Sequence, residues 1–285
     1  MSVPTSTAPV APAPATSGAA SDSGQPGSGL FVAGLASEWT KLRSVRSTVW
    51  SLFATFAIMV GLGSLLSLAY VSRYERIGLV ERLTFDPTAH SLRGLFLAQL
   101  AIGVLGVLTI TAEHATELIR TTFIAVPQRR VVLAAKGAVF GLVALLVCMV
   151  AAFAAFFSGQ AILDTKHLGV ALSDPHVLRA VLGAGAYLTI VGLISLAVGA
   201  IVRRTAGAIA TTFALVLVLP LLSQALPSPW DRDVGKFLPS ELGAALFSVR
   251  ARDLLLSPGI ALLVAVGWVA ALLAVATLLI TRRDA

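Results

Sequence analysis

The sequence predicts an all-α membrane protein with six transmembrane helices, and three observations carry that prediction. Of its 285 residues, 57% are hydrophobic and only 12% are charged, whereas soluble domains carry about 25% charge. Mean hydropathy is +0.90. Apolar runs recur along the chain at the length of roughly 18 residues or more that a helix needs to cross a hydrocarbon core. We therefore expect a multi-pass membrane protein.

The first 29 residues differ from the rest of the chain. They consist mainly of Ala, Pro, Ser, Thr and Gly, and Asp22 is their only charged residue. Such a segment buries too little apolar surface to offset the entropy of ordering it. It also lacks the basic and apolar regions of a secretory signal peptide. We expect residues 1–29 to be a disordered cytoplasmic tail and residues 30–285 to form the membrane domain.

An amphipathic helix is expected between this tail and the first span, over residues 30–47. Apolar residues recur there at three- and four-residue steps, namely Phe31, Leu35, Trp39, Leu42, Val45 and Val49. Most of the charged residues, Glu38, Lys41, Arg43 and Arg46, lie off that stripe. A helix with a tryptophan and a basic face typically lies in the membrane interface. A simple helical lead-in to the first span is the alternative.

Six apolar segments follow, and each is long enough to span a membrane. They cover residues 49–71, 92–112, 131–157, 177–202, 206–226 and 259–280. Only Arg203, Arg204 and Thr205 separate the fourth from the fifth, which predicts a tight helical hairpin with both arginines at one membrane face. Gly137 and Gly141 form a GxxxG pattern, which favours close helix packing. Because the spans are rich in glycine, this match does not locate an interface.

The distribution of basic residues favours both termini on the cytoplasmic side. With the N-terminus inside, the 21 Lys and Arg residues divide almost evenly between the two sides. The inner segments are shorter, however, so their bases lie closer to the span ends, where the positive-inside rule acts. The same rule accounts for the net charge of +7. We therefore expect contact with membrane lipid and no nucleic-acid partner.

The apolar spans contain no residues that indicate catalysis or ion coupling. None has an ionisable residue near its middle, which proton- or ion-coupled transporters usually need. The chain has no HExxH, GxSxG or GxxxxGK[ST] motif, and its single cysteine, Cys148, lies in an apolar run. We predict that the chain is not an enzyme and binds no cofactor, metal or nucleotide itself. It is either passive or driven by another protein.

Residues 113–130 form a polar island between the second and third apolar segments. The sequence EHATELIRTTFIAVPQRR contains two glutamates, three arginines, a histidine and a proline. In a helix, Glu117 and Arg120 would attract each other at i,i+3. Glu113 would then need another basic partner, for which Arg120, Lys136 and the bases of residues 30–47 are candidates. Pro127 would end the helix. The alternative is a solvated loop whose bases anchor the spans.

Three segments of the chain resemble the ABC-2 type permeases of actinobacteria. They are EWTKLRSVRSTVW before the first span, the polar island after the second, and KFLPSELGAA before the sixth. The resemblance extends from Phe31 to the C-terminus and includes the number and spacing of the spans. It implies the membrane subunit of an ATP-binding cassette exporter in the plasma membrane. Such subunits pair as homodimers or heterodimers, have cytoplasmic termini and use ATP bound by separate ATPase subunits.

The resemblance also implies roles for particular segments. The helix with Trp39, Lys41, Arg43 and Arg46 would be the interfacial connecting helix, and residues 113–127 would be the coupling helix that enters a groove of the ATPase. The residues expected to act in coupling are Glu113, Glu117, Arg120, Pro127, Arg129 and Arg130. Residues 236–243 would belong to re-entrant or extracellular helices. The sequence departs from the family pattern at Glu117, where relatives commonly have glycine. The substrate would be hydrophobic or amphipathic. A non-transporting membrane scaffold or assembly factor is the rival interpretation.

Overall fold

The computed structural model describes residues 35, 38–40, 46–115, 129–225, 235–249 and 255–283. Over these residues the regular structure is entirely helical, with no strand. Six helices are long and apolar enough to cross a membrane. The expected six-helix, all-α architecture is therefore confirmed at this level.

The six membrane-length helices alternate in direction along the bundle. They are α2 (Arg46–Arg73), α5 (Leu95–Ala115), α7 (Arg129–Leu163), α8 (Val177–Val202), a composite of α9 (Thr205–Phe213) and α10 (Leu219–Gln224), and α13 (Pro258–Arg283). A π-helical segment, Ala214–Val218, joins α9 to α10. It ends two residues before Pro220, which has no N–H for the usual i→i−4 bond, and the wider turn accommodates that loss.

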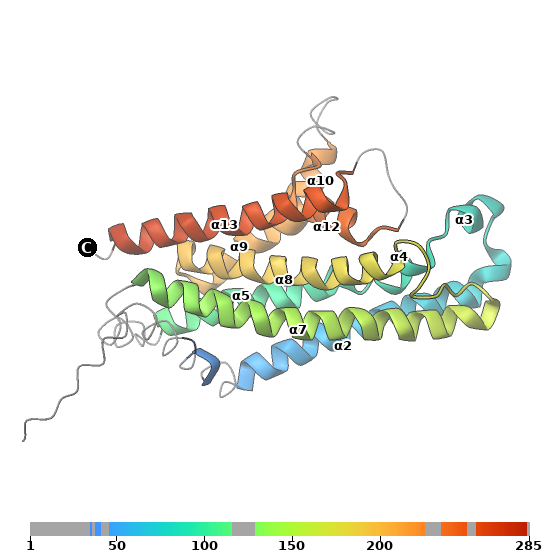
Figure 1. The fold of residues 1–285 in the computed structure, drawn as a ribbon, viewed down its shortest axis with the longest axis horizontal. Coiled ribbons are helices and arrows are strands. Elements are labelled where there is room, and N and C mark those ends of the chain that lie inside the picture. The colour runs from blue at the N-terminus through green and yellow to red at the C-terminus, as the bar shows by residue number, and fades with distance from the viewer. Residues whose placement is uncertain are drawn as a thin grey trace, which may run out of the picture.

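Alternation of the helices gives the bundle two distinct ends (Figure 1). The end that holds the start of α2, the α8–α9 turn and the last turn of α13 is called the chain-end face. The opposite, connector face carries the short helices α3 (Leu79–Thr84), α4 (Pro87–Ser91) and α12 (Pro239–Phe247). The described beginning and end of the chain thus lie on the same side of the bundle.

Helix α8 forms the centre of the bundle. In its most apolar stretch 78% of the residues are buried, compared with 22% in α2 and in α13. It packs against α5, α7, α12 and α13, and its ends match the predicted fourth span. The turn after it is as tight as expected: Arg203 adopts a left-handed conformation with φ 59°, and α9 begins at Thr205. The Thr205 hydroxyl donates to Thr111 Oγ1 at 3.0 Å, which joins the hairpin to α5.

Helix α7 is longer than the sequence indicated, and the predicted end of the third span was wrong. It continues past Phe157 to Leu163, because the polar residues after Phe157 are satisfied within the protein. Gln160 Nε2 donates to Pro87 O at 3.1 Å and to Ser91 Oγ at 3.0 Å. The Val170 amide donates to Gln160 Oε1 at 2.9 Å. Gln160 therefore fastens the end of α7 to the connector face and does not end the helix.

Tyr70, Phe85 and His90 form an aromatic cluster on the connector face, where α2 packs against α4. Tyr70 stacks on Phe85 with ring centroids 3.9 Å apart. His90 lies beside both rings, and its Nε2 lies 3.1 Å from Leu66 O. Burial lowers the pKa of His90, and the hydrogen bond to Leu66 opposes that shift in part. A neutral imidazole that donates from Nε2 fits this environment.

A buried hydrogen bond between α5 and α8 yields a first prediction. Tyr187 OH donates to Gln99 Oε1 at 2.7 Å in the bundle core. Tyr187→Phe leaves the Gln99 amide oxygen without this donor, so we expect a loss of about 1 kcal/mol in unfolding free energy. Tyr70→Phe is the matched control, because among the described residues Tyr70 OH is buried and has no hydrogen-bond partner. It should leave stability unchanged or raise it. Equal effects in detergent unfolding would contradict the assignment.

Candidate functional site

A buried ion pair lies at the chain-end face of the bundle. Lys136 Nζ is 2.5 Å from Glu38 Oε2, and the two side chains are only 4% and 5% exposed. Lys136 lies two turns into α7, and Glu38 belongs to the short helical stretch of residues 38–40. Removing two charges from water is tolerated when they are closely paired. The pair therefore joins the segment that precedes the first span to the base of the third.

The burial of Glu38 corrects the amphipathic pattern expected for residues 30–47. Glu38 was expected on the polar face with the basic residues, but it points into the protein and is 4% exposed. Its neighbour Trp39, expected on the apolar stripe, is 49% exposed. The reason is Lys136, which supplies the opposite charge from a position 98 residues further along the chain. Periodicity within one helix does not reveal such a partner.

One partner of the ion pair was also a candidate partner for Glu113. The structure places Lys136 against Glu38, and because the Glu113 side chain is outside the described part of the chain, the partner of Glu113 stays a prediction. Glu113 itself lies in the last turn of α5. The polar island is thus flanked by α5, which carries Glu113, and by α7, which carries Lys136.

The other predicted site residues divide into two groups. Arg46 and Arg130 are exposed in the first turns of α2 and α7, and Arg129 is the first residue of α7. Lys41, Arg43, Glu117, Arg120 and Pro127 lie outside the described residues, as do most of the helices expected over residues 30–47 and 113–127 and all of the tail at 1–29. The structure therefore locates the two ends of the polar island, residues 113–115 and 129–130, and not the residues between them.

The chain-end face carries an excess of basic residues. Those in the described part of the chain are Arg46, Arg129, Arg130, Lys136, Arg203, Arg204, Arg282 and Arg283, and the acids are Glu38 and Glu113. Such a face suits anionic lipid headgroups and acidic protein surfaces. Because Lys136 is paired and buried, the exposed arginines supply the field that a partner would meet.

The described residues contain no group of three or more His, Cys, Asp or Glu side chains that could hold a metal ion. Cys148 is buried in α7. The chemistry that the described chain-end face offers is therefore electrostatic: an internal ion pair surrounded by exposed bases.

The fold defines a class, the multi-pass helical membrane protein. Its buried ion pair lies on the face that also holds both described ends of the chain. No protein-family model and no curated protein matches the chain. The function must therefore be argued from the residues themselves.

Proposed function

We propose that this chain is the membrane-spanning permease subunit of an ATP-binding cassette transporter, exporting a hydrophobic or amphipathic substrate with a separate ATPase subunit. The observation that carries the proposal is the Glu38–Lys136 pair. It links the N-terminal segment to the helix that begins where the polar island ends. Glu38 belongs to one of the three segments that resemble ABC-2 permeases, and Lys136 lies six residues after the end of another.

The geometry supplies a path for force from the polar island into the bundle. The island joins the end of α5 to the start of α7, and both helices pack against the central α8. A partner that pushed on residues 113–130 would move the base of α7. Through Lys136 the same push would reach Glu38 and the segment before α2. One docking event would thus act on α5, α7 and α2 together.

The spans themselves favour an external energy source. Ionisable residues of the described spans lie near the helix ends, as Lys136 and Arg179 do. Ion-coupled carriers usually place such groups near the bilayer midplane. Work done by an ATPase at the chain-end face needs no such group. Pairing with a second permease subunit is part of the proposal, and the exposed apolar faces of α2 and α13 offer surface for it or for lipid.

Co-purification provides a test of the ATPase partner. We expect the tagged chain, extracted from its own cells in mild detergent, to bring down a protein with a Walker A motif. Combining Glu113→Gln, Glu117→Gln and Arg120→Gln should reduce that recovery at least about tenfold, because charge-assisted hydrogen bonds contribute about 1.5–3 kcal/mol each.

The matched control changes two glutamates and one arginine on the connector face, Glu75→Gln, Glu81→Gln and Arg76→Gln. All three residues are exposed there, so ATPase recovery should stay at the wild-type level. If the wild-type chain brings down no ATPase, and the island variant still exports, the proposal is wrong. A non-transporting membrane scaffold would then be the better account.

A further inference from the structure

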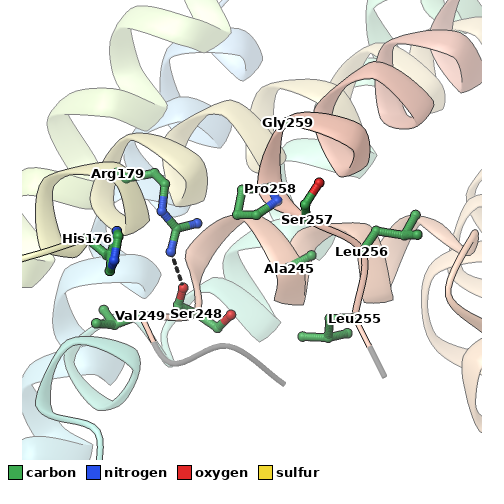
Figure 2. A pocket seen from close by; sticks show the side chains of 10 residues that line it. All are labelled: His176, Arg179, Ala245, Ser248, Val249, Leu255, Leu256, Ser257, Pro258 and Gly259. Carbon is green, nitrogen blue, oxygen red and sulfur yellow. Dashed lines mark hydrogen bonds between the residues drawn. The ribbon is translucent and has the colours of Figure 1, made fainter. Parts of the chain in front are cut away.

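A pocket on the connector face combines a cationic wall with apolar walls. It has a volume of about 620 Å³ and lies where the start of α8, the end of α12 and the start of α13 meet (Figure 2). This volume is within the range of about 300–1,000 Å³ that small-molecule sites occupy. The pocket is at the opposite end of the bundle from the Glu38–Lys136 pair, so it is separate from the site described above.

Arg179 is the charged group of this pocket. Its Nη2 donates to Ser248 O at 2.7 Å and its Nη1 to Leu246 O at 3.4 Å, at the C-terminal end of α12. A guanidinium has five N–H donors, so these two bonds fix its orientation and leave donors for a ligand. Figure 2 shows Arg179 between His176 and Pro258. In the described part of the chain, backbone carbonyls thus hold the arginine in place.

Among the described residues that line the pocket, no Asp or Glu balances the charge of Arg179, while His176, Ser248 and Ser257 add further polar groups. Ser257 and Gly259 lie at the start of α13, where the helix dipole also favours negative charge. A half-buried arginine with no acidic side chain among the described lining residues favours an anionic ligand.

The remaining walls of the pocket are apolar. Ala245, Val249, Leu255 and Leu256 line it, and Ala245 is almost fully buried. An inorganic anion would leave these walls in contact with water. A ligand with an anionic head and an apolar chain would satisfy Arg179 and cover the apolar walls at the same time.

We propose that this pocket binds an anionic amphiphile, with its carboxylate or phosphate on Arg179 and its apolar chain against α12 and the start of α13. The binding needs no ATPase, so it stands or fails separately from the transport proposal. The same chemistry is available from a membrane lipid headgroup and from a free amphiphilic acid.

Binding is measured on the full chain in nanodiscs of phosphatidylcholine, with dansylaminoundecanoic acid as the fluorescent probe and dodecyl phosphate as competitor. We expect saturable binding that dodecyl phosphate displaces and that dodecyltrimethylammonium and inorganic phosphate do not. Arg179→Gln should weaken probe binding about tenfold or more, because it removes a charge-assisted contact. Arg73→Gln, at an exposed arginine of the same face, is the control.

A second variant keeps the test valid if Arg179→Gln fails to fold. A Cβ added at Gly259 meets no atom within 4 Å, and Gly259 lines the pocket. Gly259→Phe should therefore fill the pocket without disturbing the bundle and should also weaken binding about tenfold. Gly267→Phe is its match on the same helix, since Gly267 has equally open surroundings and lies outside the pocket lining. It should bind the probe like the wild type.

The source of the ligand is distinguished by lipid composition. If lipid headgroups occupy the pocket, nanodiscs of phosphatidylglycerol should weaken probe binding to the wild type but not the weak binding to Gly259→Phe. If the ligand is a free amphiphile, both lipid compositions should give the same wild-type affinity. Either result supports the site. Wild-type binding that dodecyltrimethylammonium displaces equally well, or unchanged binding by a folded Gly259→Phe variant, would overturn it.

Discussion

Glu38→Leu is expected to destabilise the protein by about 3–5 kcal/mol, because it removes one partner of the buried Glu38–Lys136 ion pair. Lys136→Met should have a similar effect on the unfolding free energy, since it removes the other partner. The double variant Glu38→Leu/Lys136→Met should recover most of that loss. An apolar pair of similar volume avoids the desolvation of two charges. The measurement is equilibrium unfolding in mixed micelles.

The control for this prediction is a surface ion pair on the connector face. Lys166 Nζ lies 3.2 Å from Glu75 Oε1, but the side chains are 40% and 85% exposed. Lys166→Met should therefore change stability by no more than about 1 kcal/mol. If Glu38→Leu and Lys166→Met have equal effects, the buried pair does not hold the N-terminal segment to α7.

The double variant also separates stability from coupling. Under the proposed function the ion pair transmits motion from α7 to the segment before α2. The double variant should therefore unfold like the wild type while substrate export in reconstituted vesicles falls. Full export by the double variant would show that the link is structural only.

Gly106→Ala is expected to have the second large effect, because it pushes the central helix away from α5. A Cβ at Gly106 would overlap the carbonyl oxygen of Gly192 on α8, and it would come within 3.1 Å of Leu196 N. Backbone atoms cannot move aside as a flexible side chain can. We expect a loss of about 1–3 kcal/mol, as in other overpacked cores.

Gly137→Ala is the matched control for this substitution. Gly137 also lies inside a membrane-length helix, but a Cβ there meets no atom of the described residues within 4 Å. Because alanine has the higher helix propensity, this variant should be more stable by about 0.5–1 kcal/mol. Thermal unfolding in detergent gives the sign of each change. A destabilised Gly137→Ala together with an unaffected Gly106→Ala would contradict the packing described for α8.

The sequence predicted the spans well, because a membrane-length helix has a local signature in apolar residues. All six were found, and the two-residue turn at Arg203 and Arg204 followed from the short gap between the fourth and fifth. The GxxxG pattern at Gly137 and Gly141 was less informative. Its two glycines meet open space and one leucine side chain, while the close crossings use Gly106 and Gly183. Which glycine faces a neighbour depends on tertiary packing and not on spacing.

The features that the sequence missed depend on distant partners. In the sequence, Gln160 indicated the end of a span, but in the structure its amide forms hydrogen bonds with Pro87, Ser91 and Val170. Glu38 was expected to be a surface acid, but it is buried in an ion pair with Lys136. Helix α12 did have a local signal, since Pro239 stands at its start and Glu241 in its first turn, a pattern typical of helix N-termini.

Site-specific photocrosslinking tests most directly whether residues 113–130 dock a separate ATPase, as proposed. Benzoylphenylalanine is placed at Phe123, within the polar island, or at Phe237, on the connector face and 44% exposed. Both positions hold phenylalanine, so each change is similarly conservative. Irradiation in the native membrane should give a covalent adduct with a Walker A protein from position 123 and none from position 237. An adduct from position 237, or no adduct from either position, would contradict the account.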